Sequence, residues 1–94
     1  MTETNQHRIH LHVIKDSKCI KCSLKLNEEE MKKKLWVGLY VVRREHDNKY
    51  TQFINIDTSK PEVIFEYVRD GIYEVRLFEG KYNKIETSDP ITVG

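Results

Sequence analysis

The last third of the sequence, from Asp70 to Gly94, constrains the fold of this chain more than any other segment. Strand side chains alternate between two faces, and this period places together on one face Tyr73, Val75 and Leu77. The Asp70-Gly71 pair before them is a turn signal. Residues 84–93 continue as a second strand after a short connection. The segment therefore predicts a hairpin that belongs to a β-sandwich.

Strand patterns also occur in the rest of the chain. Alternation, or a high content of β-branched and aromatic residues, predicts strands over residues 7–15, 19–26, 35–44, 49–56 and 61–68. With the final hairpin these make about seven strands at a spacing of roughly ten residues, which favours an antiparallel β-sandwich. We expect one domain over residues 7–94, preceded by a flexible arm at residues 1–6.

One segment has a helical pattern. Asn27 can cap a helix, and Glu30 stands three residues later, as a capping box requires. The segment is acidic at its start and basic at its end, which suits the helix dipole. We therefore expect one short helical turn near residues 28–34, between two strands.

Two strings, Leu35-Trp-Val-Gly-Leu-Tyr40 and Asp70-Gly-Ile-Tyr-Glu-Val-Arg-Leu-Phe78, resemble the SKICH domain family. Tyr73, just inside a strand entered from a turn, is also similar to the tyrosine corner of immunoglobulin-like sandwiches. The closing segment, Glu86-Thr-Ser-Asp-Pro-Ile-Thr-Val93, is similar to that of immunoglobulin-like domains attached to various enzymes. The resemblance implies an immunoglobulin-like fold and non-catalytic binding to proteins or membrane-associated partners.

The chain is close to electrically neutral, with 16 basic and 15 acidic residues and a net charge of +1. This balance argues against a dedicated nucleic-acid-binding protein. The start is polar and lacks the apolar stretch of a signal peptide. No apolar run approaches the roughly 20 residues that a membrane helix needs. We therefore expect a soluble cytoplasmic protein.

Cys19 and Cys22 are spaced as in metal-binding and redox CxxC motifs. They fall within a predicted strand, however, where their odd spacing sends the two thiols to opposite faces. We expect Cys22 in the core and Cys19 at the surface, with neither in a disulfide or a metal site. His10 and His12 share a strand face and could supply two zinc ligands, but exposed surface histidines are the simpler interpretation.

The sequence contains no recognisable catalytic motif. Its glycines are scattered rather than gathered in a phosphate-binding loop. Neither a Gly-x-Ser-x-Gly elbow nor a His-Glu-x-x-His helix is present. A small sandwich also has little interior beyond its core in which to build a pocket. We expect no enzymatic activity, no cofactor and no metal.

Residues 35–42 are apolar on both faces of their predicted strand. Only one face can enter the core of a two-layer sandwich, so a loop must cover the other face or it stays exposed as a patch. We expect this patch to be a protein interface, within a homodimer or with another protein. If Trp36 faces outward, the anchors are Tyr40, Val42, Ile72 and Phe78. If it faces inward, they are Val37, Leu39 and Val41. In either case we expect Trp36 to help build the core with Val75 and Leu77.

A different class of function rests on basic residues. Lysine side chains could form a surface for phosphoinositides or an anionic membrane, and the candidates are Lys21, Lys25, Lys32, Lys33 and Lys34. A solvated surface of mixed charge accounts for these residues as well. Membrane contact is therefore the alternative, and protein binding is the main hypothesis.

Overall fold

The computed structural model describes residues 8–14 and 16–94 as an all-β fold with one 3-10 turn. The expected arm at residues 1–6 lies outside the described residues. The strands in chain order are β1 (Ile9–Ile14), β2 (Cys19–Leu24), β3 (Leu35–Val41), β4 (Gln52–Asn55), β5 (Glu62–Phe65), β6 (Gly71–Glu79), β7 (Asn83–Thr87) and β8 (Ile91–Val93). Within the described ranges, no helix has the length and apolarity to cross a membrane.

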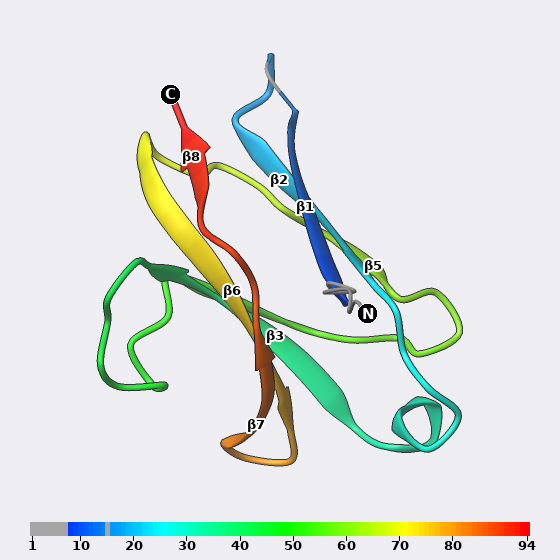
Figure 1. Ribbon diagram of the computed structural model, residues 1–94. Coiled ribbons are helices and arrows are strands. Elements are labelled where there is room, and N and C mark those ends of the chain that lie inside the picture. The colour runs from blue at the N-terminus through cyan, green and yellow to red at the C-terminus, as the bar shows by residue number, and fades with distance from the viewer. Residues whose placement is uncertain (1–7, 15) are drawn as a thin grey trace, which may run out of the picture.

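Two antiparallel sheets form the two layers of a sandwich (Figure 1). One sheet has the order β1-β2-β5. The other has the order β4-β3-β6-β7, and β8 pairs with the first part of β6. β3 and β6 pair along the whole of β3, from Leu35 opposite Glu79 to Val41 opposite Tyr73. The all-β sandwich predicted from the sequence is confirmed.

The core lies between the sheets and follows from the alternation of apolar residues. Every second residue of β2 turns inward and is buried, while its neighbours keep some exposure. β3 and β6 contribute core side chains from the other sheet: Leu35, Val37, Leu39, Tyr73, Val75 and Leu77. Val75 and Leu77 thus lie in the core, as predicted. Trp36 does not, because its position between Leu35 and Val37 places it on the outer face.

The last predicted strand, residues 84–93, is interrupted. Residues 88–90 separate β7 from β8, because Pro90 has no N–H to donate to a ladder. Ser88 keeps this segment attached to β6, since its N–H donates to the Val75 carbonyl at 2.8 Å and its Oγ accepts from the Val75 N–H at 2.8 Å. On the side away from β3, β6 therefore pairs with two short strands, β7 and β8, where the sequence predicted one long strand.

The predicted helical segment is a single 3-10 turn, Glu30–Lys32. Asn27 and Glu30 exchange the hydrogen bonds of a capping box, from the Glu30 N–H to Asn27 Oδ1 at 2.8 Å and from the Asn27 N–H to Glu30 Oε1 at 3.0 Å. Glu30 is buried and also pairs with Arg8, just before β1. Burial opposes its ionisation, but hydrogen bonds from Arg8 and Asn27 outweigh burial and hold the pKa of Glu30 below its usual range.

The tyrosine corner is present at the start of β6. The Tyr73 ring is buried, and its hydroxyl donates to the Arg69 carbonyl at 2.8 Å. This bond ties the end of the β5–β6 connection to the strand that follows it. This hydrogen bond confirms the predicted similarity of Tyr73 to the tyrosine corner of immunoglobulin-like sandwiches.

Replacing Tyr73 by Phe should destabilise the domain by about 1 kcal/mol, because the Arg69 carbonyl loses its donor while the ring stays in place. A loss of that size lowers the melting temperature of a small domain by roughly 4–8 °C. Tyr67→Phe is the matched control, since Tyr67 is 88% exposed. Circular dichroism should show wild-type melting for the control. Equal melting of both variants would contradict a structural role for the corner hydrogen bond.

Candidate functional site

An aromatic cluster occupies the outer face of the larger sheet, on the side away from the core. Trp36 of β3 and Phe78 of β6 are cross-strand neighbours, and their rings stack with centroids 4.3 Å apart and planes 20° apart. Three further rings meet the Trp36 indole edge-on at centroid distances of 5.9, 6.0 and 5.7 Å, and they belong to Tyr50, Phe53 and Tyr82. These five residues and Tyr40 are called the aromatic cluster below.

Gly38 makes room for Tyr40 in this cluster. A Cβ atom at position 38 would lie 2.6 Å from Tyr40 Cε1, closer than real side chains approach. The Tyr40 ring therefore lies across the glycine of its own strand. Arg76, the partner of Gly38 on β6, places its guanidinium carbon 4.1 Å from the centroid of the Tyr40 ring. The missing side chain thus permits a cation–π contact on the outer face.

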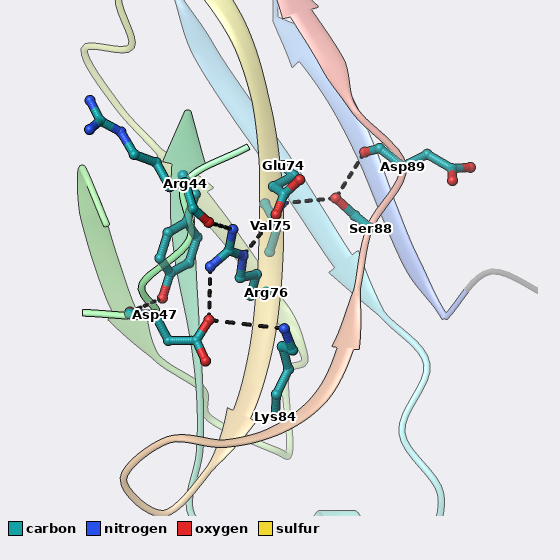
Figure 2. A network of polar contacts seen from close by, with 9 residues as sticks. Arg44, Asp47, Glu74, Val75, Arg76, Lys84, Ser88 and Asp89 are labelled. Atoms are coloured by element: carbon teal, nitrogen blue, oxygen red, sulfur yellow. Dashed lines mark hydrogen bonds and ion pairs between the residues drawn. The ribbon is translucent and has the colours of Figure 1, made fainter. Parts of the chain in front are cut away.

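Arg76 is a buried cation at the centre of a polar network (Figure 2). Its Nε donates to Glu74 Oε2 at 2.7 Å, and its Nη1 donates to Asp47 Oδ1 at 2.8 Å. Its Nη2 donates to the Arg44 carbonyl. Burial alone would lower the pKa of Arg76, but the hydrogen bonds to Glu74 and Asp47 outweigh burial and raise that pKa above its ordinary value.

The network fixes the β3–β4 connection, residues 42–51, over part of the aromatic cluster. Asp47 of this connection pairs with Arg76, and its carbonyl accepts a hydrogen bond from the Tyr40 hydroxyl. Tyr40 and Phe78 have no exposed surface in this arrangement. Burial raises the pKa of Tyr40 above its ordinary value. A loop thus covers Tyr40, and part of the second apolar face is buried, which was one of the two outcomes expected for it.

Four predicted interface residues cannot contact a partner in this fold. Val37 and Leu39 lie in the core between the sheets with no exposed surface. Tyr40 and Phe78 do lie on the outer face, as expected when Trp36 faces outward, but other parts of the chain cover them completely. Alternation assigns a face to a side chain and does not show what covers that face.

Val42 and Ile72, two further predicted anchors, lie near the opposite end of β6 from Trp36. Val41, the remaining one, ends β3 and is 38% exposed. Ile72 is 52% exposed, and Val42 is half-buried. The Val42 N–H donates to the Ile72 carbonyl at 3.0 Å. Their role in partner binding stays a prediction.

The remaining part of the aromatic cluster borders an open depression. The Trp36 indole N–H donates to the carbonyls of Gly80 and Lys81 at 2.8 and 3.1 Å, which holds the β6–β7 hairpin beside the ring. Phe53 is 50% exposed and Tyr82 is 44% exposed. The depression has a volume of about 310 Å³ and is lined by Trp36, Tyr50, Phe53, Asn55, Gly80, Lys81 and Tyr82.

Tyr50, Phe53 and Tyr82 are not among the site residues predicted from the sequence. For Phe53 a signal was available, because alternation along β4 puts Ile54 and Ile56 toward the core and Phe53 on the other face. Tyr82 lies in the β6–β7 turn, where no period exists to place it.

The five candidate lysines lie on β2 or in the β2–β3 connection. Within residues 8–14 and 16–94, carboxylates pair with two of them. Lys21, on β2, pairs with Glu62 at 3.3 Å. Lys33, after the 3-10 turn, pairs with Glu79 at 3.4 Å. The other three, Lys25, Lys32 and Lys34, are exposed. Pairing reduces the positive potential that an anionic membrane would meet.

The two cysteines lie on opposite faces of β2, as predicted. Cys22 is buried in the core, Cys19 is partly exposed, and both are free thiols. His10 and His12 are exposed on the outer face of β1. Within residues 8–14 and 16–94, no three side chains of His, Cys, Asp or Glu come together as a metal site would require.

No known protein family and no curated protein matches this sequence. Among solved structures, the chain is similar to the fn3 domain of human contactin 1, with a TM-score of 0.63 and 10% sequence identity, over 99% of this chain and 79% of that chain. At this identity the likeness shows the fold, an immunoglobulin-like β-sandwich. A fold of this kind does not define what is bound. The finer resemblance to SKICH domains receives no support from these comparisons.

Replacing Arg76 by Met should destabilise the domain by about 3 kcal/mol, because Glu74 and Asp47 lose the buried cation that pairs with them. Lys84→Met is the matched control. Lys84 Nζ lies 4.0 Å from the same Asp47 carboxylate, but its side chain is 46% exposed. The control should therefore lose about 1 kcal/mol or less. Urea unfolding measures both, and similar midpoints would contradict the role given to Arg76.

Cys22 should be inert to thiol reagents in the folded protein, because burial raises the pKa of its thiol to about 12. Cys19 is partly exposed and should react. A chromogenic disulfide reagent at neutral pH should therefore titrate Cys19 alone in the native protein and both thiols in urea. The Cys19→Ser variant should show no native reaction. A prompt native reaction of that variant would contradict the burial of Cys22.

Proposed function

We propose that this chain is a non-catalytic protein-interaction module that binds its partner through the open part of the aromatic cluster. The observation that carries the proposal is the exposure of Phe53 and Tyr82 around the half-buried Trp36. Exposed apolar patches on small domains commonly mark interaction sites. Aromatic anchors supply a large share of the energy at such sites.

The open part is also rigid, which favours binding. Trp36 stacks on Phe78 and donates to the hairpin carbonyls, so its rotamer is fixed before any partner arrives. A fixed anchor loses little side-chain entropy on binding. The depression therefore suits a side chain inserted by a partner.

The partner is another protein or a second copy of this chain, and sedimentation distinguishes a homodimer from a monomer. A relationship to SKICH domains and a cytoplasmic location belong to the same proposal. The free thiols are consistent with a reducing compartment.

The alternative of a phosphoinositide or membrane module has less support. Lys21 and Lys33 are paired with carboxylates, and the basic side chains come from β2 and the β2–β3 connection rather than from one built site. Salt-sensitive cosedimentation with vesicles of anionic lipid would favour this alternative.

The test replaces both exposed anchors by Ser, in a Phe53→Ser/Tyr82→Ser variant. Immobilised wild-type protein should retain partner proteins from a native lysate, and the variant should retain them at least about tenfold less well, as expected for lost aromatic anchors. Tyr67→Ser is the matched control, because Tyr67 is an exposed aromatic residue outside the aromatic cluster. Equal retention by a folded double variant would overturn the proposal.

A further inference from the structure

β4 is an edge strand of the larger sheet. It pairs with β3 on one side, and no strand among residues 8–14 and 16–94 pairs with its other side. Residues 50–56, Tyr-Thr-Gln-Phe-Ile-Asn-Ile, contain no charged residue, no proline and no glycine. Natural proteins protect exposed edges with charges, prolines or bulges, because a bare edge is a template for pairing with another chain. The β4 edge lacks protection by charges and prolines.

Two other edges of the sandwich have such protection. β5 begins with Glu62 directly after Pro61. β7 carries Lys84 and Glu86, and its register against β6 is shifted by an irregularity between Leu77 and Phe78. β4 therefore differs from β5 and β7 in having neither a charged residue nor a proline at its edge.

The backbone alternation of β4 leaves defined groups free at the edge. The Ile56 N–H donates to β3 at 2.9 Å, and hydrogen bonds of an antiparallel pair involve every second residue. The backbone groups of Ile54 therefore point toward β3, and those of Phe53 and Asn55 point toward the open edge. Phe53 and Asn55 also line the depression. A strand added at this edge would place alternate side chains beside that depression.

The described lining of the depression contains one charged side chain, and that side chain is basic. It belongs to Lys81, and no carboxylate is among the described lining residues. Charge complementarity therefore favours a partner segment that carries carboxylates.

We propose that β4 binds an extended acidic segment of a partner protein as an added strand, with large apolar side chains at alternate positions entering the depression. This inference rests on the proposed function and names its binding mode. Backbone groups of Phe53 and Asn55 supply hydrogen bonds that do not depend on partner sequence. The aromatic cluster and Lys81 select the side chains.

The test selects ligands from a random library of peptides of about eight residues displayed on phage. Wild-type protein should enrich peptides with large apolar residues at alternate positions and an excess of Asp and Glu. Synthetic versions of the enriched peptides should bind the Asn55→Pro variant about tenfold more weakly than they bind the wild-type protein. This substitution removes an N–H at the open edge but none that bonds to β3. Asn55→Ala, which keeps that N–H and removes only the side chain, should bind clearly more tightly than Asn55→Pro.

Lys81→Glu gives a second test that leaves the edge intact, and it should shift the enriched peptides from acidic to basic. Failure to enrich peptides, enrichment of proline-rich peptides, or equal binding by Asn55→Pro and Asn55→Ala would overturn the inference. A wild-type dimer that Asn55→Pro dissociates would overturn it in favour of a second copy of this chain. If Phe53→Ser/Tyr82→Ser loses the lysate partners while Asn55→Pro keeps them, the proposed function stands and the added strand does not.

Discussion

Strand β3 is apolar on both faces, and other parts of the chain cover the whole of one face and part of the other. Its inner face packs against the smaller sheet in the usual way. A two-layer sandwich offers no third layer for the outer face. Here the β3–β4 loop covers part of that face. The buried guanidinium of Arg76 holds this loop through the Asp47 carboxylate and the Arg44 carbonyl (Figure 2). Apolar burial on this side therefore depends on a polar interaction, because residues 42–51 carry few apolar side chains of their own.

The features that could be predicted from the sequence are those that depend on residues close together in the chain. Alternation placed Val75 and Leu77 in the core and Cys19 and Cys22 on opposite faces, and the turn before Tyr73 indicated the corner hydrogen bond. The exposure of Tyr40 could not be predicted in this way. It depends on a contact between Asp47 and Arg76, which are separated by 29 residues, and no local pattern records such a contact.

The division of the aromatic cluster into a covered half and an open half bears on stability and function together. The covered half, at Tyr40 and Phe78, adds buried area to a small domain that has one modest core. The open half, at Phe53 and Tyr82, leaves apolar area in water, which favours association and lowers solubility. Proteins retain such surface mainly where it serves binding, since stability alone would favour its removal.

The interruption at residues 88–90 has a consequence for motion. β7 and β8 each pair with a different part of β6, and between them Ser88 bonds to the backbone of Val75. β8 is three residues long, so it can detach from β6 while β7 stays paired. Its amide hydrogens should then exchange with solvent through a local opening that is less costly than global unfolding.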